Sequence, residues 1–409
     1  MTGFFSSKET ESKTRPGGKK YSCIACGLIK NVEMPRIEPF GEFKKKILLI
    51  GESPNETDIS KDELWTGRHG RTVRKALEKL GVDIYEDCTS INAVNCLPLT
   101  KAGDLREPKQ FEIECCRKIV VDKVIANLKP KVIILLGEAA LESVVGKRWK
   151  KGIGTMAKWH GAVIPDQDLK CWVCPTWHPS EVEHRNEDVA LIWKMELESA
   201  IKMVNVAFPV YKEPKIHYLD DITGLYSIVK RYKRVVTDIE ATGLKPHAEG
   251  HKIVCASIAV SPDEVYVFMM PDKLKDCKPY IDILQDENIE KMGHNIKYED
   301  TWFNVILKAE VKNWGFDSML AAHVLDNREG IVGLKFQTFI KLGIPDYDSE
   351  ISPYLKGDDK NANSFNKILE LISTEDGRHK LMKYCALDSI NEYRLANLQM
   401  EIMDDQIPF

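Results

Sequence analysis

The chain has 409 residues, of which 43% are hydrophobic, and this length predicts two or three domains. Its 58 basic and 62 acidic side chains give a net charge of −4, which excludes a globally basic nucleic-acid-binding protein. No apolar run reaches the roughly 20 residues that span a bilayer, and the N-terminus lacks the apolar segment of a signal peptide. We therefore expect a cytoplasmic protein, in which eleven cysteines favour metal or cluster binding over disulfides.

Cysteines mark the start of the first predicted domain. Cys23 and Cys26 form a Cys-x2-Cys motif just before a glycine, where a tight turn can direct both sulfurs at one metal. Cys96 and the adjacent pair Cys115 and Cys116 are further candidate ligands. Four thiolates suit zinc or an iron–sulfur cluster, and the spacing alone does not choose between them.

Strands alternate with helices around these cysteines. Residues 46–50 and 131–136 have the apolar character of buried strands, and residues 72–80 have the pattern of an amphipathic helix. This alternation predicts a mostly parallel sheet, with functional residues at the carboxyl ends of the strands. The polar residues expected there are Glu52, Asn92 and His178.

Several segments of this half share a resemblance. They are Gly51-Glu52-Ser53-Pro54, Trp65-Thr66-Gly67-Arg68-His69-Gly70, Asn92, Arg106-x-Pro108-x3-Glu112-x3-Cys116 and Trp177-His178-Pro179-Ser180. Together they resemble the family 4 uracil-DNA glycosylases, over about residues 21–205. The resemblance implies a three-layer α/β domain with a central parallel sheet and a [4Fe–4S] cluster. The implied cluster ligands are Cys23, Cys26, Cys96 and Cys116, with Cys116 favoured over Cys115.

The same resemblance implies a role for each polar residue of the pocket. Trp65 stacks on a flipped uracil, and Asn92 pairs with the amide edge of that base. His178 stabilises the negative charge on the leaving uracil, and Glu52 positions or polarises the attacking water. Trp65 replaces the family's usual phenylalanine, and Asn55 stands where the family has glycine. We expect uracil excision; the alternative is a domain that binds DNA without this reaction.

A short linker is expected between two halves of the chain. Pro209 and Pro214 lie five residues apart in a segment without periodicity, which indicates a stiff connection. We predict a disordered tail over residues 1–20 and a glycosylase-like iron–sulfur domain over residues 21–206. A linker over residues 207–215 leads to a second domain over residues 216–409.

The second half opens with two carboxylates on one strand. Asp238 and Glu240 are two residues apart, so both project from the same face, with Ile239 packed behind them. Neighbouring carboxylates repel each other unless a cation lies between them, and their hard oxygen atoms suit Mg²⁺ or Mn²⁺. The alternative is a pair of solvated acids at the end of a strand.

Two helical segments supply further candidate ligands. Asn295 and Glu299 are four residues apart and are expected on one helical face. Asp300 points about 100° away, which favours Glu299 as the inward acid and leaves Asp300 as a substitute. Tyr384 and Asp388 have the same spacing. A strand pair, a helix carboxylate and Tyr-x3-Asp are the parts needed to hold two metal ions about 3.5–4 Å apart.

These three motifs resemble those of the DEDDy 3′–5′ exonucleases, the proofreading domains of family A DNA polymerases, which have an RNase H-like fold. The segment Phe316-Asp317-Ser318-Met319-Leu320 also resembles one that those polymerases carry. The resemblance covers about residues 216–400, although the family usually has aspartate where this chain has Glu299. The implied metal ligands are Asp238, Glu240, Glu299 and Asp388, with Tyr384 orienting the attacking water and Asn295 contacting the substrate.

Together, the two halves predict a DNA-editing enzyme of phage or bacterial replication or repair. It would hydrolyse DNA 3′ ends, excise uracil and act beside a separately encoded DNA polymerase. The alternative is a proofreading subunit whose first half only binds DNA.

Overall fold

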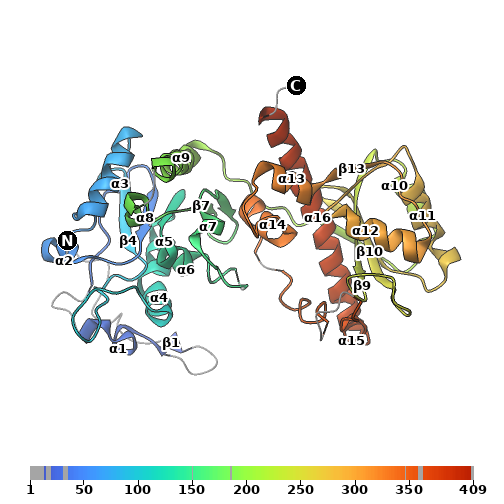
Figure 1. The fold of residues 1–409 in the computed structure, drawn as a ribbon, viewed down its shortest axis with the longest axis horizontal. Helices are drawn as coiled ribbons and strands as arrows, with labels where there is room; N and C mark the ends of the chain where they lie inside the picture. The colour runs from blue at the N-terminus through green and yellow to red at the C-terminus, as the bar shows by residue number, and fades with distance from the viewer. Residues whose placement is uncertain are drawn as a thin grey trace. The chain divides into compact units, whose positions relative to one another are not determined.

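The computed structural model describes residues 13–14, 20–30, 36–149, 151–184, 187–345, 347–357 and 363–406. Most of the tail expected over residues 1–20 lies outside these ranges. The chain divides into two compact units, Met1–Val210 with Gly343–Pro345 and Tyr211–Leu342 with Asp346–Phe409 (Figure 1). Residues 207–214 have no regular secondary structure. In the described ranges, no helix combines the length and apolar character needed to cross a bilayer.

A five-stranded sheet forms the centre of the first unit, in the order β4-β3-β5-β7-β6. The first four of these strands are parallel, and β6 is an antiparallel edge. The strands are β3 (Ile47–Gly51), β4 (Cys88–Asn92), β5 (Val132–Leu136), β6 (Ile164–Asp166) and β7 (Cys171–Thr176). Every residue of β3, β4 and β5 is buried, as expected for parallel strands covered on both faces.

Helices cover both faces of this sheet, so the unit has the expected three layers (Figure 1). One layer contains α3 (Arg68–Lys79), α8 (Pro179–His184) and α9 (Glu187–Lys202), which pack on the sheet in one apolar core. The other contains α4 (Gln110–Cys116), the π-helical turn η3 (Arg117–Val121), α5 (Asp122–Leu128) and α6 (Glu138–Val144). The short elements are α1 (Cys23–Cys26), η2 (Leu28–Lys30), α2 (Glu56–Lys61), α7 (Met156–Trp159) and η4 (Met203–Asn205).

The predicted helix over residues 72–80 begins earlier than expected, at Arg68. Gly67 occupies the capping position before the first turn and has no side chain that could accept a backbone N–H. Its carbonyl oxygen accepts the N–H of Arg71, as in a regular helix. The sequence therefore lacks the Ser, Thr, Asp or Asn that normally signals a helix start.

A six-stranded mixed sheet forms the second unit, in the order β13-β12-β9-β10-β11-β8. Its strands are β8 (Lys215–Leu219), β9 (Arg234–Ala241), β10 (Ile253–Ser261), β11 (Glu264–Met269), β12 (Glu290–Gly293) and β13 (Trp314–Asp317). β10 runs antiparallel to both β9 and β11, whereas the pairs β9–β12, β12–β13 and β8–β11 are parallel. The mixed α/β architecture agrees with the expected RNase H-like fold.

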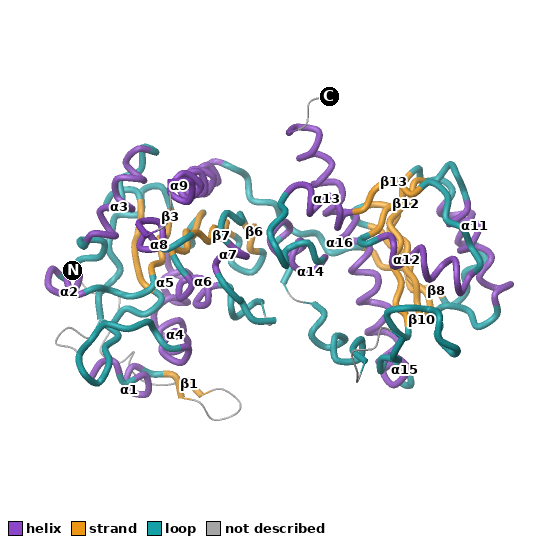
Figure 2. The backbone as a smooth tube through the Cα atoms, viewed as in Figure 1, coloured by secondary structure: helices purple, strands orange, loops and turns teal. Residues whose placement is uncertain are grey.

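The long helix α16 (Glu375–Gln406) crosses one face of this sheet and packs on β9, β10 and β11 (Figure 2). The opposite face is covered by α10 (Leu225–Val229), α11 (Lys278–Gln285), α12 (Ile296–Trp302) and the π-helical turn η6 (Phe303–Leu307). The remaining helices are η5 (Leu274–Cys277), α13 (Ser318–Leu325), α14 (Leu334–Leu342) and α15 (Ile368–Leu371). β9 therefore lies in the middle of the sheet, directly under α16.

Candidate functional site

A glycine at the end of β3 makes room for the first candidate pocket. A methyl group on Gly51 would lie 2.4 Å from Asn92 Oδ1 and 2.8 Å from the ring of Trp65. These distances are shorter than van der Waals contact, so any larger residue would displace one of the two side chains. The structure thus brings together the two residues that the sequence analysis assigned to base binding.

The loop that carries Trp65 is held by a buried aspartate. Asp58 accepts hydrogen bonds from the N–H and the hydroxyl of Thr66, both at 2.9 Å. Asn55 caps α2 by accepting the N–H of Asp58 at 3.0 Å, and Asp58 accepts the N–H of Asn55 in return. The asparagine at position 55 therefore has a structural role as a helix cap. Trp65 itself has a left-handed backbone, with φ 65°.

Glu52 follows β3 and lies in a site that favours its neutral form. Burial raises the pKa of its carboxyl to about 7, and the negative charges of Glu107 and Glu138 add to this shift. One of its oxygen atoms accepts the N–H of Ala139 at 3.2 Å. Gly137 allows this approach, because a side chain there would lie 2.4 Å from the same oxygen. A carboxyl with a pKa near neutrality can exchange protons at physiological pH.

His178 faces the same region in one defined neutral form. Burial, followed by the charge of His69, lowers its pKa to about 4. The backbone N–H of Ser180 donates to Nδ1 at 3.3 Å, so Nδ1 is an acceptor and the proton lies on Nε2. The Ser180 hydroxyl lies 2.6 Å from the same Nδ1 atom. Ser180 thereby fixes His178 as a hydrogen-bond donor through Nε2.

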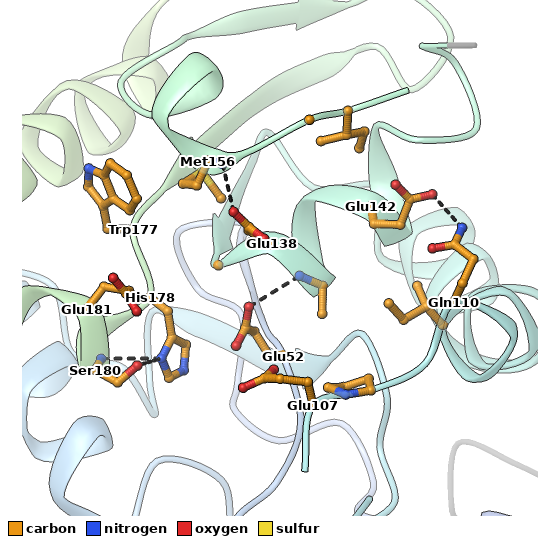
Figure 3. Close-up of a pocket in the computed structure, with 16 residues that line it drawn as sticks. Glu52, Glu107, Gln110, Glu138, Glu142, Met156, Trp177, His178, Ser180 and Glu181 are labelled. Atoms are coloured by element: carbon orange, nitrogen blue, oxygen red, sulfur yellow. Dashed lines mark hydrogen bonds between the residues drawn. The ribbon is translucent and has the colours of Figure 1, made fainter. Parts of the chain in front are cut away.

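Two cavities meet at Glu52 and His178. The first has a volume of about 250 Å³ and is lined by residues that include Trp65, His69 and Asn92. The second has a volume of about 510 Å³, and Figure 3 shows Glu52 and His178 on its wall together with several other acids. The first cavity contains all four residues that the sequence analysis placed in the glycosylase pocket.

Five thiols line one small apolar pocket of the same unit. They are Cys23, Cys26, Cys96, Cys115 and Cys116. α1 carries the first two, with Ser22 as its N-terminal cap and Gly27 at φ 84° as its C-terminal cap. Both the backbone N–H and the side-chain amide of Asn95 approach Cys116 Sγ at 3.4 Å. Five sulfurs lining one apolar pocket, with N–H donors aimed at Cys116, fit a metal or cluster site that needs four of them.

Three carboxylates meet in the second unit. Asp238 and Glu240 from β9 and Asp388 from α16 each offer an oxygen atom within 4.8 Å of the others. Burial, followed by the charge of Asp388, raises the pKa of Asp238 to about 8. Burial, followed by the charge of Asp238, raises the pKa of Glu240 well above its ordinary value. A divalent cation would relieve this repulsion, so the donor set fits a Mg²⁺ or Mn²⁺ site.

Glu299, rather than Asp300, lies toward these acids. Glu299 on α12 is buried, its Oε2 atom has no hydrogen-bond partner, and the charge of Asp238 contributes to its raised pKa after burial. Asp300 instead accepts hydrogen bonds from Trp314 Nε1 at 3.2 Å and from Asn304 Nδ2 at 3.0 Å. Glu299 lies outside the group of three oxygens within 4.8 Å. An unpaired buried oxygen beside this group nevertheless fits a metal ligand.

Asn295 lies just before α12, so its position differs from the expected place within a helix. Its backbone is left-handed, with φ 71°, and its N–H donates to Asp317 Oδ1 at 3.1 Å. Asp317 also accepts the N–H groups of Ile296, Met319 and Leu320. The segment around Asp317 thus joins the starts of α12 and α13.

Tyr384 lies one turn before Asp388 on α16 and is largely buried. Its ring packs against the ammonium group of Lys335, 4.2 Å from the ring centre. Lys335 also forms an ion pair with Asp388, and the hydroxyl of Tyr347 donates to Asp388 Oδ1 at 2.5 Å. Lys335 and Tyr347 lie outside the motifs predicted from the sequence.

Comparison with known proteins matches one family to each of the two units. The family model for the Uracil DNA glycosylase superfamily matches residues 38–196, and the model for the 3′-5′ exonuclease family matches residues 216–397. A type-4 uracil-DNA glycosylase from Pyrobaculum aerophilum is 30% identical over 145 residues, which cover 35% of this chain and 70% of that protein. A type-4 uracil-DNA glycosylase from Thermotoga maritima is 28% identical over 182 residues, covering 44% of this chain and 87% of that protein.

The chain belongs to the uracil-DNA glycosylase superfamily through its first unit, and it carries a 3′-5′ exonuclease family domain in its second. These assignments make it a hydrolytic enzyme. Among solved structures, Brucella melitensis NrnC with bound Mg²⁺ has a TM-score of 0.32 at 15% identity, over 47% of this chain and 83% of that one. Escherichia coli RNase D has a TM-score of 0.34 at 14% identity, over 47% of this chain and 46% of that one.

Proposed function

We propose that the domain of residues 216–409 removes nucleotides from DNA 3′ ends by metal-dependent hydrolysis. The observation that carries this proposal is the cluster of Asp238, Glu240 and Asp388, whose oxygens lie within 4.8 Å of one another. We assign Glu299 as the fourth ligand, because its Oε2 atom is buried without a partner beside the cluster. Bound Mg²⁺ or Mn²⁺ supplies Lewis acidity there.

The chain's own residues then have separate tasks. Tyr384 is raised in pKa by burial and by the charge of Asp388, so its hydroxyl stays protonated and can orient the attacking water. Asn295, half-buried at the start of α12, is assigned to substrate contact. The attack of water on phosphorus breaks the bond to the 3′ oxygen and releases a nucleoside 5′-monophosphate.

We propose further that the domain of residues 21–206 recognises and excises uracil. The pocket between Trp65 and Asn92 supports this activity, because an aromatic face and a carboxamide are the two groups needed to stack a base and to read its amide edge. Glu52 is assigned to activate water, and the Nε2–H of His178 to stabilise the departing base. A neutral donor suits this task, because the developing charge is negative.

Cys23, Cys26, Cys96 and Cys116 are proposed to hold a [4Fe–4S] cluster. The N–H groups of Asn95 that approach Cys116 support its choice over Cys115. The amide of Asn95 also donates to the carbonyl of Asn92 at 2.7 Å. The cluster would therefore stabilise the loop that carries the base-reading asparagine.

The context we propose is replication or repair in a bacterium or a phage-infected cell, with the nuclease acting beside a separately encoded DNA polymerase. Its support is the likeness of the second half to proofreading domains. Purification of the native protein together with a polymerase would test this association, and its isolation without one would contradict it.

Replacing Asp238 should abolish nucleotide removal. Asp238→Ala deletes a ligand shared by the carboxylate cluster, so we expect the rate of trimming of a 5′-labelled single-stranded DNA in Mg²⁺ to fall by at least about 10²-fold. Asp220→Ala, at an exposed aspartate, is the matched control. Equal trimming by Asp238→Ala and the wild type would refute the assignment. A parallel RNA substrate determines which nucleic acid is preferred.

Base release should depend on Asn92 and not on added metal. We expect Asn92→Ala to slow the formation of abasic sites in a uracil-containing oligonucleotide by about 10²-fold, because the site loses the group that reads the base. Alkaline cleavage of the product measures this rate in the presence of a chelator. The exposed Asn205→Ala is the control. If the wild type forms no abasic sites, the first domain only binds DNA.

The pH dependence of base release should report Glu52. Since burial raises its pKa to about 7, Glu52 is protonated and inactive as a base at lower pH, and the rate should rise with pH through about 7 and then level. His178, with a pKa of about 4, stays neutral across this range and adds no second step. Glu52→Gln should flatten the profile, whereas Glu78→Gln, at an exposed position of α3, should preserve it. A wild-type rate that is constant from about pH 5 to 9 would contradict the role of Glu52.

The proposed cluster should depend on Cys116 and not on the adjacent Cys115. Protein purified without oxygen should contain about four iron atoms per chain, and Cys116→Ser should lower this content while Cys115→Ser retains it. Iron analysis and visible absorption measure the outcome. A colourless protein with one zinc ion per chain would show that the site holds zinc.

A further inference from the structure

A lysine lies within the acidic site of the second unit. Lys335, the second residue of α14, pairs with Asp388 and hydrogen-bonds to the Tyr347 hydroxyl at 3.0 Å. Its ammonium group is 4.2 Å from the ring centres of both Tyr347 and Tyr384. The Lys335 side chain is 17% exposed, so this charge remains within reach of solvent and substrate. Lys335 and Tyr347 lie outside the three motifs that define the nuclease, whereas Tyr384 and Asp388 belong to the third.

The contacts of Lys335 place a positive charge beside two groups assigned to the reaction. Asp388 is an assigned metal ligand, and Tyr384 is assigned to orient water. Two aromatic faces favour a cation between them, which holds the ammonium at this position. The backbone of α14 is fixed by a buried stretch from Phe336 to Ile340, whereas the lysine side chain has four rotatable bonds. The charge can therefore move by several ångströms while the helix stays in place.

A charge count indicates what the lysine does when the site is loaded. Two divalent ions balance the charge of four ionised carboxylates. The negative charge of the phosphodiester, and the additional charge that develops during attack, are then not compensated. The ammonium of Lys335 is then no longer required by Asp388. It is a cation at the edge of the same site, and fixed cations next to a reacting phosphate lower the barrier to hydrolysis.

We propose that Lys335 is a substrate-contacting residue of the nuclease: its ammonium pairs with Asp388 in the free protein and passes to a non-bridging oxygen of the scissile phosphate when divalent ions and DNA are bound. This inference rests on the proposed exonuclease activity. It assigns two successive partners to one charge. Lys335 thus competes with the divalent ion for Asp388 before DNA binds and assists the reaction afterwards.

The effects of the two partners of Lys335, Asp388 and the scissile phosphate, can be distinguished by measuring metal binding and turnover independently. Lys335→Met removes the charge but keeps a long side chain that packs against both tyrosine rings. Without DNA, we expect this variant to bind Mn²⁺ up to about tenfold more tightly, because a competing cation is lost from Asp388. With 5′-labelled single-stranded DNA, we expect kcat to fall by about 10²-fold. Lys335→Arg should restore most of kcat, because it keeps the charge and the ring contacts.

The controls distinguish this role from a structural one. Lys233→Met, at an exposed lysine, should match the wild type in both measurements. A purely structural Lys335 would weaken Mn²⁺ binding and kcat together in Lys335→Met, and this result, or an unchanged kcat, would overturn the inference alone. A wild type that does not trim DNA, with Asp238→Ala binding Mn²⁺ as the wild type does, would overturn the proposed activity and the inference together.

Discussion

Repulsion between buried carboxylates is the constraint on which the second unit depends. Asp238 and Glu240 share one face of β9 because they are two residues apart, and α16 adds Asp388 from above. Burial, followed by the charge of Asp388, raises the pKa of Asp238 to about 8. Such an arrangement costs folding free energy, so it persists only where packing elsewhere compensates for it.

That compensation comes from the contact between α16 and the sheet. Ser257 on β10 donates to the carbonyl of Cys385 at 2.9 Å, and its hydroxyl lies 2.6 Å from that of Ser389. The thiol of Cys385 approaches Asp238 Oδ2 at 3.5 Å. These bonds fix the position of α16 on the strands, and they thereby fix the distance of Asp388 from β9. A small side chain at position 257 is what lets the helix backbone come this close.

Sequence reasoning located the residues whose spacing within one element reveals a shared face, and it missed those defined by long-range contacts. The buried strands of the parallel sheet and the acids of β9 follow from local pattern alone. Lys335 lies in an ordinary amphipathic helix, and only the fold shows that it meets Asp388, 53 positions away. Ser180 was visible within the His-Pro-Ser segment, but its effect on the proton of His178 depends on backbone geometry. For Asp58, the sequence contains a signal of its structural role, because Asn55 and Asp58 form an Asn-x2-Asp helix-capping pattern.

The two sites treat the charge of DNA in opposite ways. In the first, the Nε2–H of His178 is a neutral donor and Glu52 has a pKa of about 7, which suits the uncharged base that we propose it binds. In the second, a phosphate must approach clustered acids, which repel it until cations are present. Under the proposed function, we expect substrate binding at the second site to be coupled to cation binding and binding at the first to be independent of it. The proposed function is compatible with a net charge of −4, because bound cations would supply the attraction for a polyanion locally, where the chemistry occurs.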